Sequence, residues 1–281
     1  MRYGFVLPWG DARTAADLAA IAERSGWDGF FVWEPVWGVD AWVALAAAAM
    51  TTSRIRLGTM LTPLPRRRPW DLAGQTAALD NLSGGRVILS VGLGAAHAGW
   101  LAFEPDPGRR VRARLLDEGL EILTGLWAGQ PYEFEGTHYH VTPSDFMPPP
   151  PPVQRPRIPI WVVGGWPARR SMARAARYDG WLPNVVGKGA AGPATPEQVR
   201  AGAEWIRDFR TIEGLATYGY DVICEGTTPA GDAEAGAAIV APWQDAGATW
   251  WIEADWSIAR EAVRDYAEER LSAGPPRVDR A

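Results

Sequence analysis

The chain has 281 residues, 47% of them hydrophobic and 22% charged, and a formal net charge of -5. This size suits one α/β barrel better than two ordinary domains. The negative charge gives no reason to expect a nucleic-acid partner, which would require clustered Lys and Arg, so we expect a small-molecule substrate. The N-terminal sequence lacks a signal-peptide pattern and no run of roughly 18 apolar residues occurs, so we expect a cytoplasmic protein without a membrane segment.

The spacing of apolar residues switches repeatedly between strand-like and helix-like periods, which is typical of βα units and a parallel sheet. Strands are predicted at residues 3–7, 29–33, 55–60, 86–91, 158–163, 180–182, 218–224 and 249–253. Helices are predicted after Thr14, which resembles a capping box with Asp17, and over 40–50, 72–82, 116–127, 168–178 and 197–212, with a last one carrying Ala259, Val263 and Tyr266. Roughly eight strand–helix pairs predict a single-domain (β/α)8 TIM barrel over residues 1–281. An open doubly wound sheet is the alternative, but the turn at 8–12 lacks its glycine-rich fingerprint.

An insertion is predicted at about residues 95–157, over the C-terminal mouth of the barrel. Residues 132–140 read as a hairpin that turns near Gly136, and 148–152 read as a polyproline connector. His138 and His140 on this hairpin are either lid residues or ordinary exposed side chains.

The active site of such a barrel lies at the C-terminal ends of its strands and in the loops that follow. Several of the 16 tryptophans fall there, which suits a wide, flat ligand, although tryptophans also fill barrel interiors. The candidate positions are Pro8, Trp9, Trp33, Glu34, Trp37, 59–63, Gly92, Gly94, His97, Gly164, Gly165, Trp166, Trp181, Asn184, Glu225 and Glu253.

The segment 162–170 leaves a strand through two glycines and enters a helix through a proline. We expect the N–H groups of Gly164, Gly165 and Trp166, helped by Arg169, to hold a phosphate at this helix N-terminus.

Five segments together resemble the bacterial luciferase-like oxidoreductases: residues 22–29, 54–63, 79–86, 92–94 and 157–161. The likeness runs from Met1 to about Trp181. It implies a (β/α) barrel that binds FMN or the deazaflavin F420. It also implies that the third strand ends at Thr59, Met60 and Leu61 in a bulge, often with a non-prolyl cis peptide, that presses on the cofactor ring. Gly92, Gly94 and Trp181 complete the expected cofactor-binding set.

The chain departs from F420-dependent relatives that oxidise sugar phosphates or alcohols. Where they carry an acidic residue followed by histidine, this chain has Glu34 and Pro35, and where they place a glutamate after the fourth-strand glycines it has Ala95. Glu34, His97 and Glu253 remain as proton-transfer candidates, and we expect Glu34 or His97 to be the catalytic residue.

Single cysteine and lysine residues exclude other chemistries. Cys224 is the only cysteine, so no intramolecular disulfide can form, and its strand-like neighbours predict a buried thiol. Lys188 is the only lysine and lies in a glycine-rich loop, which disfavours a Schiff-base aldolase. No residues have metal-ligand spacing, so no metal is expected.

These observations predict a homodimeric oxidoreductase for hydride transfer to, or monooxygenation of, a small organic substrate. The alternatives are a non-catalytic flavin-binding barrel and a flavin-free, phosphate-binding isomerase. F420 is favoured slightly over FMN, because the run Arg66, Arg67 and Arg68 follows the third strand and suits the polyglutamate tail of F420. The use of arginine in place of lysine points the same way by association with GC-rich genomes.

Overall fold

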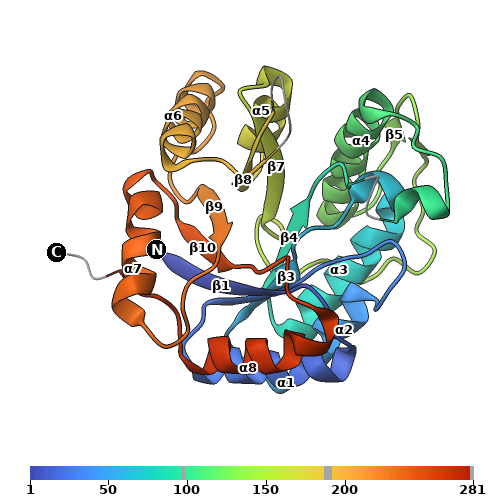
Figure 1. Ribbon diagram of the computed structural model, residues 1–281. Coiled ribbons are helices and arrows are strands. Elements are labelled where there is room, and N and C mark those ends of the chain that lie inside the picture. The colour runs from blue at the N-terminus through green and yellow to red at the C-terminus, as the bar shows by residue number, and fades with distance from the viewer. Residues whose placement is uncertain (96–98, 187–191, 279–281) are drawn as a thin grey trace.

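The computed structural model describes residues 1–95, 99–186 and 192–278. Parallel strands close into a barrel in the order β1, β10, β9, β8, β7, β4, β3, β2, with the helices outside it (Figure 1). The barrel strands are β1 (Arg2–Leu7), β2 (Gly29–Val32), β3 (Arg56–Thr59), β4 (Val87–Val91), β7 (Ile160–Trp166), β8 (Gly180–Val185), β9 (Asp221–Gly226) and β10 (Trp250–Glu253). The predicted (β/α)8 barrel is confirmed.

Each strand is followed by a helix, and side-chain caps fix where several of them begin. The helices are α1 (Ala12–Arg24), α2 (Ala41–Thr51), α3 (Pro69–Ser83), α4 (Arg109–Ala128), α5 (Arg169–Ala176), α6 (Pro196–Ile212), α7 (Ala233–Asp245) and α8 (Val263–Ser272), with short 3-10 helices η1 (Leu64–Arg66), η2 (Trp100–Ala102) and η3 (Arg260–Ala262). The first helix begins earlier than predicted, because Asp11 accepts a hydrogen bond from the Thr14 N–H and acts as its N-cap. Helix α7 had no predicted position, and Pro242 lies inside it.

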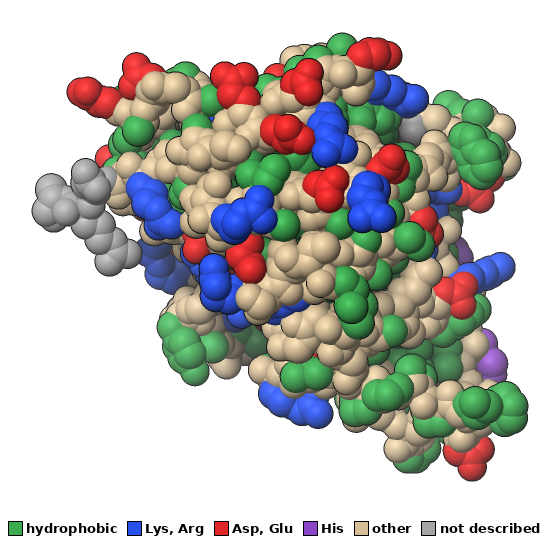
Figure 2. All heavy atoms as spheres, turned by 90° about the horizontal axis from the view of Figure 1, so that it is seen from below, with side chains coloured by type: hydrophobic (Ala, Val, Ile, Leu, Met, Phe, Trp, Pro, Cys, Tyr) green, Lys and Arg blue, Asp and Glu red, His purple; other side chains and the backbone are tan. Residues whose placement is uncertain are grey.

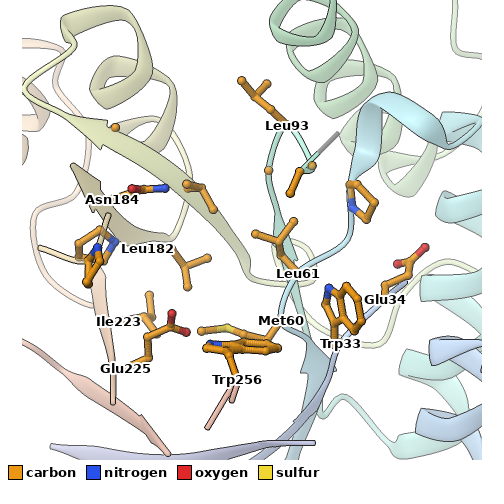
Figure 3. A pocket seen from close by; sticks show the side chains of 18 of the residues that line it. Trp33, Glu34, Met60, Leu61, Leu93, Leu182, Asn184, Ile223, Glu225 and Trp256 are labelled. Atoms are coloured by element: carbon orange, nitrogen blue, oxygen red, sulfur yellow. The ribbon is translucent and has the colours of Figure 1, made fainter. Parts of the chain in front are cut away.

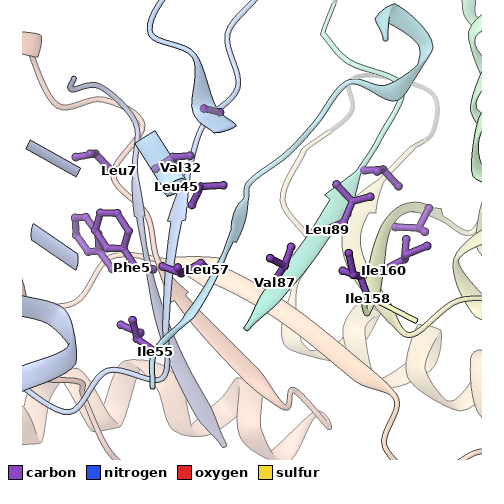
Figure 4. Close-up of a cluster of buried hydrophobic side chains, with 14 of the residues drawn as sticks. Phe5, Leu7, Val32, Leu45, Ile55, Leu57, Val87, Leu89, Ile158 and Ile160 are labelled. Carbon is purple, nitrogen blue, oxygen red and sulfur yellow. The ribbon is translucent and has the colours of Figure 1, made fainter. Parts of the chain in front are cut away.

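The strands alternate between a face that looks into the barrel and a face that packs against the helices. Outward-facing residues such as Phe5, Leu57, Leu89 and Ile160 form the buried layer under the helices (Figure 4). Their neighbours along the chain, such as Val6, Ile88 and Trp161, belong to a separate buried cluster inside the barrel, together with Phe31. Because side chains alternate along a strand, this register decides which side chains can reach the mouth of the barrel.

Aromatic rings fill the lower part of the barrel interior. The Phe31 ring centroid lies 5.4 Å from that of Trp161, which lies 5.2 Å from that of Trp250. Three inward-facing glycines leave room for Phe31: a Cβ atom would approach its ring to 2.8 Å at Gly4, 2.7 Å at Gly29 and 3.1 Å at Gly58. Side chains therefore fill the part of the barrel interior away from the C-terminal mouth. A ligand can bind only near the C-terminal ends of the strands.

The described part of the segment 95–157, predicted as an insertion, contains a barrel helix and a hairpin. Its middle is α4, which packs against α3 as an ordinary barrel helix. The predicted hairpin is present as β5 (Phe134–Glu135) and β6 (His140–Val141), paired antiparallel. The Glu118 side chain of α4 accepts hydrogen bonds from the N–H groups of 137–139, which fastens the hairpin to α4.

The surface over α1 and α8 carries mixed charge. In Figure 2, which views the molecule from this side, basic and acidic side chains lie next to one another. Arg264 of α8 pairs with Asp17 of α1 and with Glu268. Of the helices in the described ranges, none has the length and apolar character that crossing a membrane requires.

Candidate functional site

A cavity of about 920 Å³ opens at the C-terminal ends of the barrel strands. Figure 3 shows Met60 and Trp256 near its centre, Leu182 and Ile223 on one side, and Trp33 on the other. Trp9 and Trp33 also line it, and their rings meet edge to face with centroids 5.1 Å apart. A cavity of this size with largely apolar walls suits a flat, drug-sized or larger organic ligand.

The chain bends sharply where β3 ends, and this bend forms part of the cavity wall. The peptide between Met60 and Leu61 is cis, as the family resemblance led us to expect. Met60 and Leu61 line the cavity. Thr59 does not: it is fully buried, and its hydroxyl lies 2.9 Å from that of Thr62. Thr59 therefore supports the bend from behind.

Glu34 lies at the end of β2 with both carboxylate oxygens engaged. Oε2 accepts a hydrogen bond of 2.6 Å from the Thr62 hydroxyl, and Oε1 accepts one of 3.0 Å from Arg67 Nη1. Burial raises the pKa of the Glu34 carboxyl, and Arg67 and then Thr62 oppose that rise. Although Glu34 borders the cavity, these contacts engage both of its oxygens and join the β2 loop to the β3 bend.

The glycines after β4 bring the backbone close to the cavity. Gly92 and Gly94 both line it, and Gly94 has a φ of 74°, in the region that favours glycine. Arg112 of α4 holds this loop, because its Nη1 donates to the carbonyl oxygens of Leu93 at 3.1 Å and Gly94 at 2.7 Å.

Two arginines lie over the Trp100 ring at the rim next to this loop, and a third lines the same cavity. Arg66 and Arg112 lie over the Trp100 ring, 5.3 and 5.4 Å from its centroid. Arg66, Arg109 and Arg112 all line the cavity. Of the predicted run of three arginines only Arg66 faces the cavity, because Arg67 is paired with Glu34 and Arg68 lies over Trp70.

The glycine pair of the predicted phosphate site lies inside β7 rather than after it. Gly165 faces the cavity, and its N–H donates to the Ser171 hydroxyl at 2.9 Å. Gly164 faces outward, where a Cβ atom would meet the Trp181 ring at 2.6 Å. Ser171, in the first turn of α5, lines the cavity. It therefore supplies the side-chain hydroxyl at this helix N-terminus.

Three further residues predicted for the cofactor site lie outside the cavity wall. Trp181 is fully buried on the outer face of β8, and its indole donates to the Gly164 carbonyl at 2.9 Å. Arg169 is exposed at the start of α5, and Trp166 is half-buried at the end of β7. The alternation along β7 and β8 explains the placement of Gly164 and Trp181, since both occupy outward-facing positions.

The two glutamates at the ends of β9 and β10 have opposite surroundings. Glu225 faces into the barrel and lines the cavity, which gives water access to it. The surrounding protein nevertheless raises the pKa of its carboxyl, against a hydrogen bond from Trp256. Glu253 is fully buried on the outer face, where it accepts hydrogen bonds from the N–H and hydroxyl of Thr228 and lies 3.5 Å from Arg270. Glu253 therefore cannot reach a ligand in the cavity.

Other cavity residues were absent from the sequence-based candidates. They include Ser171, Arg109, Arg112, Trp100 and Trp256. Ser171 had a usable signal, because a hydroxyl residue two positions into a helix after a glycine strand end can reach back to the loop. The others come from distant helices and loops, which sequence spacing does not join.

Two sequence-based expectations concern residues outside the described ranges. His97, the second catalytic candidate, and Lys188 both lie there. Within the described ranges, no group of three or more His, Cys, Asp or Glu side chains is arranged to hold a metal ion.

The fold and the cavity define a (β/α)8 barrel with an organic-ligand site at the C-terminal mouth, walled by the β3 bend and the β4 glycines. The chain belongs to the luciferase-like monooxygenase family, whose sequence model matches residues 1–238.

Relatives in the same family and a solved structure of the same fold are known. A Mycobacterium tuberculosis protein provisionally named a coenzyme F420-dependent oxidoreductase is 35% identical over 179 residues, which are 60% of this chain and 50% of that protein. F420-dependent glucose-6-phosphate dehydrogenase of Kineococcus radiotolerans is 33% identical over 59% of this chain and 51% of its own length. The chain thus matches about half the length of these relatives. F420-dependent tetrahydromethanopterin reductase of Methanopyrus kandleri has the same fold, with a TM-score of 0.78, 17% identity and 97% of each chain covered.

Proposed function

We propose that the chain is an oxidoreductase that uses F420 or FMN to transfer a hydride to or from a small organic substrate, or to oxygenate it. The observation that carries the proposal is the shape and chemistry of the cavity. Its floor and walls near Met60 and Leu61 are apolar, and one end carries Arg66, Arg109 and Arg112. Such a cavity matches a ligand with a flat ring system and a negatively charged tail. Family membership and the F420-dependent names of two relatives support the same proposal.

The residues present fit such a cofactor. Met60 and Leu61 would contact its ring system, and Gly92 and Gly94 would let it approach the backbone closely. Gly165 and the first turn of α5 are our proposed phosphate site, with the Ser171 hydroxyl as hydrogen-bond donor. The bound cofactor would supply the hydride acceptor or donor, or the means of activating oxygen. The protein would bind and orient the reactants and limit their contact with water.

Two alanine variants test the phosphate site. Ser171→Ala should weaken binding of both FMN and F420, since both carry a phosphate group. Loss of one hydrogen bond to a charged group corresponds to about 1.5–3 kcal/mol. Arg169→Ala, which removes the arginine first expected to help, is the comparison and should leave the affinity unchanged, because that side chain lies outside the cavity wall. The reverse result, with only Arg169→Ala weakening binding, would return the phosphate to the position expected from the sequence.

We favour F420 over FMN because Arg66, Arg109 and Arg112 line the cavity. The polyglutamate tail of F420 needs cations beyond the phosphate site, whereas FMN does not. Fluorescence titration of Arg109→Met should show roughly tenfold weaker F420 binding, an effect that raised salt reduces, and nearly unchanged FMN binding. Arg110→Met is the matched control, because Arg110 is the next residue of α4 and does not line the cavity. Tight FMN binding without detectable F420 binding would overturn the preference.

The two alternative functions predict different results in the cofactor titration and in a substrate panel. A non-catalytic flavin-binding barrel would bind F420 or FMN but turn over no alcohol, ketone or aldehyde in a substrate panel. A flavin-free isomerase would bind neither cofactor. The titration and the panel together therefore separate the three functions.

A cytoplasmic location and a homodimer also belong to the proposal, together with a small-molecule rather than a nucleic-acid substrate. Apolar side chains are exposed on the adjacent helices α2 and α3, at Val43, Met50, Trp70 and Leu82, which supports pairing with a second copy. Sedimentation equilibrium at several concentrations tests the dimer.

A further inference from the structure

Glu225 is placed differently from every other carboxylate near the cavity. It follows Ile223 and Cys224 at the end of β9, and the alternation of the strand turns it into the barrel together with Ile223. In Figure 3 its carboxylate points into the cavity towards Met60, with Trp256 beside it. The side chain therefore lies next to the β3 bend, where the proposed function puts the reacting ring.

Glu225 also differs from Glu34 in what binds its oxygens. Glu34 is held by a cation and a hydroxyl, whereas no arginine contributes to the pKa of Glu225, whose only partner in the described ranges is the Trp256 indole. Glu34 and Glu225 are the only carboxylates among the described residues that line the cavity. Glu225 is thus the one of the two whose oxygens are available to a ligand.

The groups that face Glu225 do not carry charge. Met60, Leu182 and Ile223 surround it with apolar side chains, and Asn184 contributes an amide on the same side of the cavity. The neighbouring Cys224 stays a neutral thiol, since burial, with a smaller contribution from Glu225, raises its pKa to about 12. Desolvation by these apolar neighbours raises the pKa of the Glu225 carboxyl, although the open cavity leaves the side chain in contact with water. A carboxyl in such surroundings keeps its proton to a higher pH than a free one and can exchange it with a ligand in the cavity.

We propose that Glu225 is a catalytic residue that exchanges a proton with the oxygen of a hydroxyl or carbonyl substrate at the floor of the cavity. The inference rests on the proposed function, which supplies the hydride acceptor. In the oxidising direction, the O–H bond of the substrate would break and the C=O bond would form as the carbinol carbon loses a hydride to the bound cofactor. The hydroxyl proton goes to the Glu225 carboxylate. In the reducing direction, the carboxylic acid returns that proton to the carbonyl oxygen as the carbon receives the hydride.

The first test measures the carboxyl itself and needs no turnover. A carboxyl whose pKa is higher in the folded than in the unfolded protein makes the folded state less stable as the pH rises through the folded pKa. Glu225→Gln removes that loss, so its melting temperature relative to the unmodified protein should rise as the pH increases. Glu204→Gln on the exposed face of α6 is the matched control and should show a difference that does not change with pH. A flat difference for Glu225→Gln as well would contradict the proposal.

The second test measures catalysis with secondary alcohols and the corresponding ketones as probes, using F420 and FMN. Glu225→Gln should lower kcat by roughly 10²–10⁴-fold, the usual contribution of acid–base catalysis, with KM changed little and the pH dependence lost. Glu225→Asp should keep part of the activity and the pH dependence, and it serves if the Gln variant fails to fold. Glu34→Gln and His97→Asn, measured alongside, should keep the pH dependence.

Two kinds of failure are distinguishable. If the unmodified protein binds neither cofactor, the proposed function is wrong. If it binds a cofactor but turns over no alcohol or ketone, or if Glu225→Gln keeps the turnover and the pH profile, the role of Glu225 is wrong while the cofactor assignment stands.

Discussion

Removing Arg270 should reveal how strongly the outer face of β10 depends on one buried ion pair. The Arg270 side chain is 2% exposed, and the Glu253 side chain is 0% exposed. Arg270 donates to the Gly274 carbonyl at 2.8 Å and to the Thr228 hydroxyl at 2.9 Å, and Thr228 donates in turn to Glu253. Arg270→Met leaves the Glu253 carboxylate buried without a cation. Breaking a pair of this kind costs about 3–5 kcal/mol of the free energy of unfolding.

The loss of stability in Arg270→Met should depend on pH, and it should grow as the pH rises. Burial raises the pKa of Glu253, and Arg270 opposes that rise, so the variant should raise it further. The folded state then holds a proton that the unfolded state has released, and stability falls as the pH rises. Each additional unit of pKa shift corresponds to about 1.4 kcal/mol. The loss in Arg270→Met should therefore be smaller at about pH 5 than at about pH 8.

Urea unfolding followed by tryptophan fluorescence at both pH values measures these differences. The double variant Arg270→Met with Glu253→Gln is the control and should recover most of the stability and lose the pH dependence, because no buried charge remains. Cofactor binding by Glu253→Gln should be unchanged, since Glu253 lies outside the cavity wall. A loss in Arg270→Met below about 1 kcal/mol, or an equal loss at both pH values, would refute the reasoning.

Three further variants test how the barrel is packed and how the mouth is held. Gly202→Ala would place a Cβ atom 2.1 Å from the Trp181 ring and should lower the free energy of unfolding by roughly 1–3 kcal/mol. Gly74→Ala is the control: its Cβ would meet nothing within 4 Å, so the free energy of unfolding should rise by about 0.5–1 kcal/mol. Denaturant titration compares the two variants, and equal effects would contradict the packing argument. Arg112→Met should loosen the Gly94 loop and weaken cofactor binding, with faster amide hydrogen exchange in that loop; unchanged exchange would show that the loop does not depend on Arg112.

The sequence predicts the barrel well because its periodicity is strong. Each predicted strand overlaps an observed one, and glycine and capping residues mark many helix ends. Helix α7 escaped prediction because its alanine- and glycine-rich sequence gives a weak apolar stripe and contains Pro242. Either Asp11 or Thr14 could act as the N-cap of α1, and the local sequence does not decide between them. In the structure Asp11 accepts the hydrogen bond from the Thr14 N–H, so the helix begins at Ala12.

Only some of the residues predicted for the candidate site line the cavity. Positions tied to the strand ends, such as Met60, Gly92 and Gly165, do line the cavity, although their roles stay proposals. Trp181 and Glu253 were included because they stand near strand ends, yet the two-residue alternation turns both outward. Contacts across long sequence separations, such as Arg67 with Glu34, decide which side chains are free to react, and no local pattern reveals them.

The way Phe31 fits among Gly4, Gly29 and Gly58 has a consequence for how this barrel can vary. A methyl group at Gly58 would lie 2.2 Å from the Ile88 carbonyl oxygen, so the clash there involves backbone and no side-chain movement relieves it. Gly4 and Gly29 are limited partly by the Phe31 ring itself, and each would accept alanine more readily beside a smaller residue at position 31. Enlarging the cavity downwards would therefore require a coordinated exchange on neighbouring strands. Single replacements in the loops can reshape the mouth without that constraint, which makes the loops the accessible route to new substrates.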